Sequence, residues 1–236
     1  MSHVDQPLDA YAKKQNETLL KVIAVDGPAG AGKSSVSKAL ASSLGFIRLD
    51  TGALYRAIGL SAIRACVSPN EGEALRDHLS SIEVRLEAGE ILLNGQVEVE
   101  SLRTPEVSRA ASDFAKLPSV RAKLLELQRS IGASGPCVVD GRDIGTVVFP
   151  DAPLKIYLTA SAEARAERRL AELSTQGVDV DFETTKAEII ARDEQDMSRE
   201  IAPLKRANDA KLVDATEMSL EEVVEACREL AKAVFA

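Results

Sequence analysis

The chain has 236 residues, of which 45% are hydrophobic, and it carries a formal net charge of −8. This size and composition are typical of one well-buried globular core and exclude a fibre, a repeat array or a long disordered tail. The negative charge argues against general nucleic-acid binding, because no overall basic field is available to displace counterions from a phosphate backbone.

The N-terminal segment and the cysteines predict a cytoplasmic protein that has no membrane anchor. Residues 1–16 contain no apolar stretch of the secretory type, so we expect residues 1–19 to form an extension, with a short helix near residues 9–14. The longest apolar runs fall far short of the roughly 18 residues of a membrane span. Cys66, Cys137 and Cys227 are widely spaced and form no CxxC pair, which predicts reduced thiols and neither a disulfide framework nor a zinc site.

Short apolar runs alternate with helical patterns along the chain and predict an α/β fold. The five predicted strands are residues 21–25, 46–49, 137–139, 154–158 and 211–213. An alternating order of this kind favours a P-loop NTPase-type, five-stranded parallel sheet flanked by helices. The final helix begins with a capping box, in which Glu222 follows Ser219 by three residues.

A phosphate-binding motif follows the first strand. The segment from Gly27 to Ser34 fits the pattern G-x-x-x-x-G-K-S and precedes a predicted helix at residues 35–44. An incidental glycine-rich turn is disfavoured by this strand and helix on either side. Backbone N–H groups of such a loop, together with the helix N-terminus, bind phosphate oxygens. The predicted ATP-binding residues are Gly27, Pro28, Ala29, Gly30, Ala31, Gly32, Lys33, Ser34 and Ser35.

The motif also assigns roles to two of its side chains. Lys33 is expected to reach the β- and γ-phosphates of ATP, and the Ser34 hydroxyl is expected to ligate Mg²⁺. A P-loop alone does not decide between a GTPase, an ATPase motor and a small-molecule kinase. The chain has no evident N/T-K-x-D guanine motif, which lowers the expectation of a GTPase.

The second strand ends in a group of polar residues. Thr51 is placed to cap the next helix, and Tyr55 and Arg56 lie one turn inside it. Ligands of open α/β sheets bind at such strand ends. The alternative is that Arg56 is only a solvated helix residue.

Residues 82–99 break the alternation and predict a small antiparallel insertion of three strands. Apolar residues alternate with polar ones there, and Asn94-Gly95 is a strong signal for a type I′ hairpin turn. Two helices are expected to follow, one entered at Thr104-Pro105 and one at Pro118, each with proline at its first position.

The third strand of the main sheet ends in Asp140-Gly141-Arg142-Asp143, which places two carboxylates and a guanidinium beside the P-loop. Asp140 occupies a position like that of the Walker B aspartate, which holds the Mg²⁺ shell directly or through water. An ordinary Asp-Gly turn is the competing interpretation.

Two later helices carry clustered arginines. Arg165, Arg168 and Arg169 share one face through i, i+3, i+4 spacing, and Arg192, Asp196 and Arg199 share another through i, i+4, i+7 spacing. Such charges are often only a solvated surface. Beside a P-loop, however, arginines on a closing flap are expected to stabilise the charge of a transferring phosphoryl group. A polar loop at residues 175–181 is expected to be mobile.

These segments together resemble the bacterial cytidylate kinases, within the nucleoside monophosphate kinases. The resemblance rests on the residue runs 26–33, 49–56, 110–112, 140–152, 192–193 and 202–204. The run 140–152 and the β insertion separate this group from adenylate, guanylate and shikimate kinases. The resemblance implies a kinase domain over residues 20–236, with an NMP-binding subdomain at about 52–118 that contains the insertion, and a lid at about 162–181.

The resemblance also implies residue roles in ATP-dependent, Mg²⁺-dependent phosphorylation of CMP and dCMP. Arg56, Arg142 and Arg199 would bind the acceptor phosphate. Ser112, Arg121 and Asp143 would bind the cytosine, and Arg192 with Asp196 the pentose, although the division between Asp143 and Asp196 stays open. The full predicted CMP-binding set is Thr51, Tyr55, Arg56, Ser112, Arg121, Arg142, Asp143, Arg192, Asp196 and Arg199, and the predicted catalytic set is Lys33, Arg142, Arg168, Arg169 and Arg199.

Two alternatives stay open at this point. One is a kinase of the same fold that does not discriminate UMP from CMP, and the other is a P-loop module that binds nucleotide without turnover. The second would be expected to lack Lys33 or the arginine sets, and both are present. The partners expected are small-molecule substrates, with no nucleic acid and no membrane. No exposed heptad or long edge strand is evident, so we expect a monomer.

Overall fold

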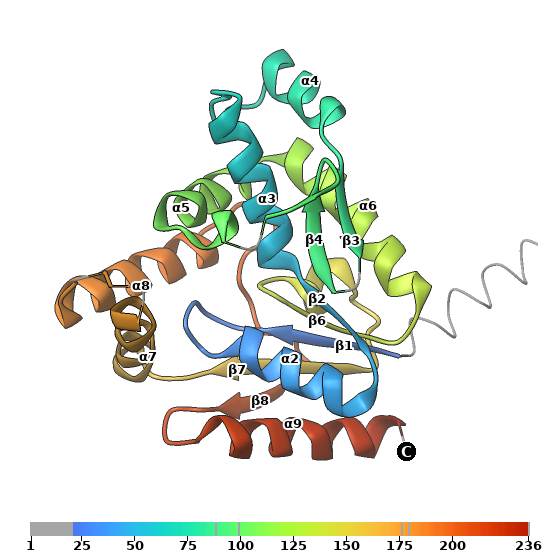
Figure 1. Cartoon of the computed structure of the whole chain (residues 1–236). Helices are drawn as coiled ribbons and strands as arrows, with labels where there is room; N and C mark the ends of the chain where they lie inside the picture. The colour runs from blue at the N-terminus through green and yellow to red at the C-terminus, as the bar shows by residue number, and fades with distance from the viewer. Residues whose placement is uncertain (1–20, 88, 99, 176, 179, 236) are drawn as a thin grey trace, which may run out of the picture.

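Five parallel strands form the main sheet of the computed structural model, which describes residues 21–235 apart from 88, 99, 176 and 179. The helix predicted near residues 9–14 lies outside this range. The spatial order is β2 (Ile47–Asp50), β6 (Cys137–Gly141), β1 (Val22–Asp26), β7 (Leu154–Thr159) and β8 (Lys211–Asp214). Each strand coincides with a predicted apolar run, and the predicted parallel arrangement is confirmed (Figure 1).

The residues of β1 alternate between two hydrophobic cores, one on each face of the sheet. Ile23 and Val25 pack with α2 (Lys33–Leu44) and α9 (Leu220–Phe235). Val22 and Ala24 belong to the opposite core, which helices α3 (Thr51–Arg64) and α6 (Pro118–Ser134) cover. Because strand side chains alternate in direction, a fully apolar strand is the pattern expected for a sheet that is covered on both faces.

The predicted insertion is a three-stranded antiparallel sheet. Its strands are β3 (Val84–Glu87), β4 (Glu90–Leu93) and β5 (Gln96–Val97). Asn94 and Gly95 have φ angles of 50° and 78°, and a type I′ turn requires positive φ at both central residues. The insertion and its neighbouring helices stand above the main sheet in Figure 1.

The helices around the insertion agree in part with prediction. α5 (Pro105–Phe114) and α6 (Pro118–Ser134) both begin with proline, as predicted, and the Thr104 side chain accepts a hydrogen bond from the first turn of α5. α3 (Thr51–Arg64) begins one residue earlier than predicted, because Asp50 caps it in place of Thr51 by accepting a hydrogen bond from the N–H of Ala53. α4 (Glu73–Ser81) was not predicted from the sequence, and it is a short helix whose buried residues are its two leucines, Leu75 and Leu79.

Smaller elements complete this part of the chain. The turn η1 (Ser101–Arg103) precedes α5, and the turn η2 (Ile144–Val148) follows β6. In η2 the N–H of Phe149 donates to the carbonyl oxygen of Ile144 at 2.7 Å, an i→i+5 hydrogen bond. π-Helical turns of this kind occur mostly at functional sites.

α7 (Ala162–Thr175) and α8 (Phe182–Met197) pack against each other and form a lobe at one side of the sheet (Figure 1). The segment between them is the predicted polar loop, of which residues 176 and 179 lie outside the described range. Asp181 caps α8 by accepting a hydrogen bond from the N–H of Thr184 at 2.9 Å.

Other local predictions are also met. Ser219 and Glu222 exchange the two hydrogen bonds of a capping box at the start of α9. All three cysteines are free, with Cys66 exposed and Cys137 and Cys227 buried. No helix in the described part of the chain has both the length and the apolar composition that crossing a membrane requires.

Candidate active site

The P-loop connects the carboxyl end of β1 to the start of α2. A Cβ atom on Gly27 would lie 1.9 Å from the carbonyl oxygen of Leu158, so only glycine fits where the loop passes β7. Gly32 has a φ of 90° and caps α2 without any side-chain hydrogen bond to the helix, so the first N–H groups of α2 are left for another acceptor. The N-terminus of a helix with free N–H groups is a favourable site for an anion.

Lys33 is buried inside this loop. Its Nζ donates a hydrogen bond to the carbonyl oxygen of Pro28 at 2.6 Å. Burial lowers the pKa of Lys33, and the neighbouring charges of Arg142 and Arg192 lower it further. A negatively charged ligand would offset both effects, because it favours the charged ammonium form.

Ser34 and Asp140 come together at the edge of the P-loop, as predicted. The Ser34 hydroxyl donates to Oδ2 of Asp140 at 3.2 Å, although 106 residues separate them. Burial raises the pKa of Asp140 to about 6, and the nearby Asp50 raises it as well. The described residues include no group of three or more histidine, cysteine or acidic side chains that could hold a metal ion by themselves. Mg²⁺ in phosphotransferases binds to one or two protein oxygens and to substrate phosphates, so one hydroxyl and one carboxylate fit this ion.

Arg48 also contacts Asp140, and the sequence analysis did not identify it. Its Nε lies 3.3 Å from Oδ1 of Asp140, and its Nη2 lies 3.3 Å from Asp50. Asp50 caps α3 through the N–H of Ala53 and pairs with Arg56 at 3.1 Å. The i, i+2 spacing of Arg48 and Asp50 on a strand was the available signal, because it places both side chains on one face.

Three of the predicted arginines lie around Asp196, and Arg56 lies close to one of them, Arg192. Arg142 donates from Nε to Oδ2 of Asp196 at 2.7 Å, and Arg199 pairs with Oδ1 of the same carboxylate. Arg192 is buried nearby, and its pKa falls to about 10, mainly through burial and then through repulsion from Arg142. Arg56 and Arg199 contribute to the same lowering of the pKa.

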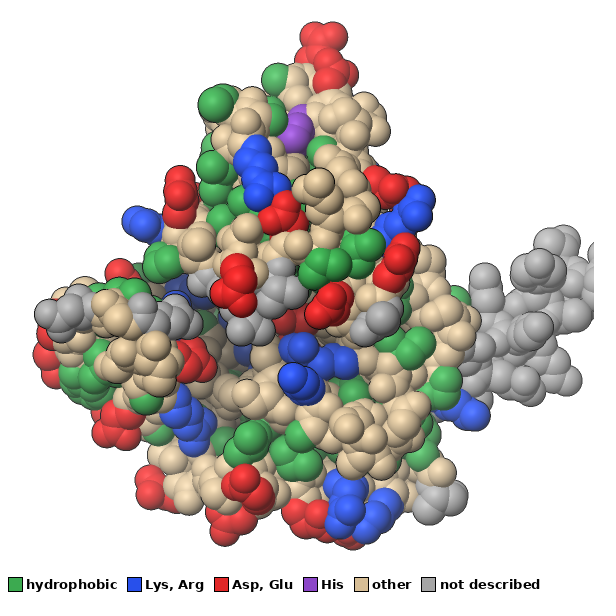
Figure 2. Space-filling view, in the orientation of Figure 1, with side chains coloured by type: hydrophobic (Ala, Val, Ile, Leu, Met, Phe, Trp, Pro, Cys, Tyr) green, Lys and Arg blue, Asp and Glu red, His purple; other side chains and the backbone are tan. Residues whose placement is uncertain are grey.

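This cluster contains more positive than negative charge. Arg142, Arg192 and Arg199 surround one carboxylate, which is Asp196. Arg56 pairs with Asp50, and Lys33 lies near both Asp140 and Asp196. The Nε atoms of Arg56, Arg192 and Arg199 are buried and have no hydrogen-bond partner within the described residues. Buried donors without partners are costly, so the arrangement suits an anionic ligand that would accept from them. Figure 2 shows Lys and Arg side chains in the hollow beside the α7–α8 lobe.

The residues predicted to bind the base come from three segments: Ser112 from α5, Arg121 from α6 and Asp143 from the segment after β6. Arg121 and Asp143 form a buried ion pair, and the Arg121 guanidinium lies 5.9 Å from the ring centroid of Tyr55. Burial raises the pKa of Asp143, and Arg121 opposes this shift. Ser112 is buried and donates to the carbonyl oxygen of Ser108 at 3.3 Å. Thr51 lies nearer the metal position and donates to the carbonyl oxygen of Asp140 at 2.7 Å.

The side chains of Arg168 and Arg169 bind other residues of this chain. Arg168 donates from Nη2 to the carbonyl oxygen of Ala215, and Arg169 pairs with Glu172 at 3.0 Å. Arg165, which shares their predicted helix face, contacts the P-loop instead. The three arginines predicted to share one face of α7 therefore have three different surroundings. The loop after β1 and the segment after β8 contact different parts of this helix.

Asp26 is a buried carboxylate that was not among the predicted site residues. Its two oxygens accept hydrogen bonds from the N–H groups of Ile144 at 2.8 Å and Gly145 at 2.7 Å. Burial raises its pKa to about 6. Asp26 thus ties the end of β1, just before the P-loop, to the turn that follows Arg142 and Asp143.

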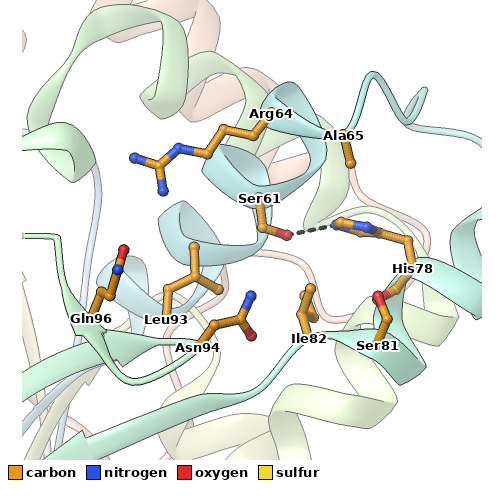
Figure 3. A pocket seen from close by; sticks show the side chains of 9 residues that line it. All are labelled: Ser61, Arg64, Ala65, His78, Ser81, Ile82, Leu93, Asn94 and Gln96. Carbon is orange, nitrogen blue, oxygen red and sulfur yellow. Dashed lines mark hydrogen bonds between the residues drawn. The ribbon is translucent and has the colours of Figure 1, made fainter.

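A cavity of about 330 Å³ lies away from these residues, on the insertion side of α3. In it the Ser61 hydroxyl and Nε2 of His78 are 2.6 Å apart, which joins α3 to α4 (Figure 3). The side chains of Leu93, Asn94 and Gln96 complete the cavity from the insertion. It contains none of the predicted site residues.

The chemistry of the main site follows from these placements. A phosphate-binding loop, a hydroxyl and carboxylate pair suited to Mg²⁺, and a buried cationic cluster all lie at the carboxyl end of one parallel sheet. Such a site can bind two phosphate-bearing ligands next to each other and neutralise charge between them.

Comparison with protein families agrees with this geometry. Residues 23–233 match the family model described as cytidylate kinase. A cytidylate kinase of Caldicellulosiruptor bescii is 48% identical over 212 residues, which cover 88% of this chain and 94% of that protein. A cytidylate kinase of Pseudomonas aeruginosa is 48% identical over 210 residues, which cover 86% and 92% respectively.

Comparison with solved structures supports the fold. An uncharacterised protein from Eubacterium ventriosum aligns with a TM-score of 0.52 over 91% of this chain and 99% of its own length. Its sequence identity of 11% limits this likeness to the fold.

Proposed function

Because the chain belongs to the cytidylate kinase family, we propose that the P-loop and the buried arginine cluster act together to transfer the γ-phosphoryl group of ATP to CMP. The observation that carries the proposal is the local excess of positive charge that Arg142, Arg192 and Arg199 place around the single Asp196 carboxylate, close to the P-loop lysine. Two phosphate groups that approach each other need this charge, because each repels the other.

On the donor side, backbone N–H groups from Gly27 to Ser34 would bind the β- and γ-phosphates of ATP. Lys33 would leave the carbonyl oxygen of Pro28 and neutralise the charge that spreads over the γ-phosphoryl oxygens. Ser34 and Asp140 would hold Mg²⁺, directly or through water. Mg²⁺ held by these two residues would supply positive charge that neutralises the negative charge of the phosphates.

On the acceptor side, Arg56, Arg142 and Arg199 would bind the phosphate of CMP. Each of them is paired with a carboxylate in this structure, either Asp50 or Asp196, which orients the guanidinium. A planar guanidinium can donate two parallel hydrogen bonds to the oxygens of one phosphate. Held in this way, a phosphate oxygen of CMP would lie in line with the γ-phosphorus, so positioning and charge neutralisation supply the catalysis.

Base selection is assigned to Asp143, with Ser112 as a second acceptor and Arg121 as the group that orients Asp143. Cytosine carries an amino donor at N4 where uracil carries an acceptor oxygen, so an acceptor in the protein favours cytosine. Arg192 and Asp196 would contact the pentose. The same assignment includes dCMP as a substrate.

This function implies that residues 20–236 contain an NMP-binding subdomain and a lid that move relative to the rest of the kinase domain. The segment from 52 to 118 would move as the NMP-binding subdomain, and residues 162–181 would close as a lid that brings Arg168 and Arg169 toward the phosphates. Residues 1–19, predicted to form an N-terminal extension, lie outside the described residues.

An activity panel tests the proposal. The protein is assayed with ATP and Mg²⁺ against CMP, dCMP, UMP and AMP at equal concentration. We expect the highest kcat/KM with CMP and dCMP. Equal use of UMP would indicate a UMP/CMP kinase, and binding of ATP without turnover of any acceptor would indicate a non-catalytic module.

A further inference from the structure

Both polar backbone groups of Ala29, in the middle of the P-loop, are bound by side chains from the α7–α8 lobe. The N–H of Ala29 donates to Oδ1 of Asp193, on α8, at 2.9 Å. The carbonyl oxygen of Ala29 accepts from Nη1 of Arg165, on α7, at 2.9 Å. Arg165 and Asp193 also form an ion pair with each other, and both side chains are 8% exposed. Figure 1 shows the loop after β1 reaching toward this lobe.

The contact is close as well as polar. A Cβ atom on Gly30 would lie 3.2 Å from Cβ of Arg165, so the loop and α7 approach each other to within van der Waals distance. Arg165 is fixed further by a hydrogen bond from its Nε to the carbonyl oxygen of Ala160 at 3.0 Å. The guanidinium is therefore also held by the segment that precedes its own helix.

The direction of these hydrogen bonds sets the direction of the phosphate-binding groups. In a trans peptide unit the N–H and the C=O point in opposite directions. Asp193 holds the N–H of the Pro28–Ala29 peptide, so the carbonyl oxygen of Pro28 points away from Asp193, toward Lys33. Arg165 holds the C=O of the next peptide, so the N–H of Gly30 points away from Arg165.

We propose that Arg165 and Asp193 are positioning residues of the ATP site, which fix the two peptide planes on either side of Ala29 so that the P-loop is preorganised for phosphates. The pair need not touch the nucleotide. It joins the lobe to the P-loop, so that a displacement of α7 and α8 changes the orientation of the phosphate-binding N–H groups. The inference rests on the proposed use of this loop to bind ATP.

A second ion pair between α7 and α8 provides the matched control. Lys186 and Glu163 also join the two helices, with their charged atoms 2.6 Å apart, but both groups are partly exposed. Within the described part of the chain, neither side chain forms a hydrogen bond or an ion pair with the P-loop. Loss of this pair tests whether a weaker α7–α8 contact is by itself enough to affect ATP binding.

The experiment measures substrate affinity in the full chain for Asp193→Asn, Arg165→Met, the double variant and the control Lys186→Met. We expect the Kd for ATP and the KM for ATP to rise about 10- to 100-fold in both single variants, because the loop loses its fixed orientation. The KM for CMP should change less than about threefold. The losses should not add in the double variant, because the two side chains act as one unit. Lys186→Met should bind ATP like the wild type.

Inorganic tripolyphosphate, used as a competitor of ATP, separates positioning from direct contact with the nucleoside. Positioning predicts that its inhibition constant rises in parallel with the Kd for ATP. An unchanged tripolyphosphate constant, or equal effects in Lys186→Met, would overturn the inference. Circular dichroism melting checks folding, and Arg165→Lys, which keeps one cation, replaces Arg165→Met if the latter does not fold. A wild type that fails to bind ATP would instead refute the proposed function.

Discussion

Lys33 donates a hydrogen bond from Nζ to the carbonyl oxygen of Pro28 at 2.6 Å, so the P-loop lysine folds back onto its own loop. The ammonium group is buried, and burial together with Arg142 and Arg192 lowers its pKa. A phosphate that enters the loop offers a stronger, charged acceptor than the carbonyl oxygen does. Lys33 is therefore held in the loop before ATP binds and has a partner to exchange for phosphate.

Lys33→Ala is expected to lower kcat by several orders of magnitude, because the charge that neutralises the transferring phosphoryl group is lost. The fold should remain, since the substitution also removes a buried cation. Steady-state kinetics with saturating ATP and CMP, together with a thermal melt, measure both effects. Near-normal turnover would contradict the P-loop assignment.

Replacement of Arg168 and Arg169 with alanine is expected to weaken kcat more than ATP affinity, because lid arginines act mainly in the closed complex. The structure adds a difference between them. Arg168 binds the carbonyl oxygen of Ala215, so Arg168→Ala should also lower the free energy of unfolding by about 1–3 kcal/mol. Arg169 pairs with Glu172 on the surface, so Arg169→Ala should leave stability nearly unchanged.

The kinetic and stability measurements on these two variants distinguish the possible roles. A loss of ATP affinity without a loss of kcat would make the side chains anchors of the bound nucleotide. If kcat and ATP affinity both stay unchanged, the only role of Arg168 and Arg169 is to form the contacts within the chain that this structure shows.

Asp143→Asn is expected to narrow the ratio of kcat/KM for CMP over UMP, because the new amide can donate to the uracil oxygen. A mismatch of two facing acceptors costs on the order of 1–3 kcal/mol, which corresponds to about 5- to 150-fold discrimination. Ser112→Ala should have the same effect more weakly. Asp143→Asn also weakens the ion pair with Arg121, but this loss affects CMP and UMP equally. The ratio of kcat/KM for CMP over UMP therefore still measures base selection.

Asp196→Ala is the matched comparison for base selection. Asp196 binds Arg142 and Arg199, so its loss should reduce the use of CMP and UMP by similar factors. Parallel kinetics with both acceptors measure this. If Asp143→Asn keeps the wild-type ratio while Asp196→Ala abolishes it, the two carboxylates have exchanged roles.

Asp26 is expected to make stability depend on pH. Its pKa is raised from 3.8 to about 6 by burial, so the folded state holds this proton more tightly than the unfolded state does. The corresponding stabilisation is complete below the unfolded pKa and is lost as pH rises through about 6. Between pH 5 and 7.5 the free energy of unfolding should therefore fall by about 1 kcal/mol through this group.

Asp26→Asn removes this titration, so urea melts of both proteins at several pH values isolate it. The difference in unfolding free energy, wild type minus variant, should decrease as pH rises across this range. A difference that stays constant, or that increases, would show that Asp26 ionises normally in the folded protein.

The sequence by itself determined the elements whose signals are local. Apolar runs predicted the five strands, Asn94-Gly95 predicted the hairpin of the insertion, and Pro105 and Pro118 predicted two helix starts. The P-loop was equally evident from the sequence, because its glycines and its phosphate-binding groups lie within eight consecutive residues. α4 escaped prediction because it has few apolar residues and no side-chain cap at Gly72.

Only the tertiary structure decided which charged groups meet. Asp193 binds the N–H of Ala29 across 164 positions of sequence, and Asp26 binds two N–H groups more than 110 positions away. Arg165 and Arg168 share a helix face, yet one contacts the P-loop and the other the segment after β8. Helix periodicity gives the direction of a side chain relative to its own axis, whereas its partner depends on how the sheet brings distant strand ends together.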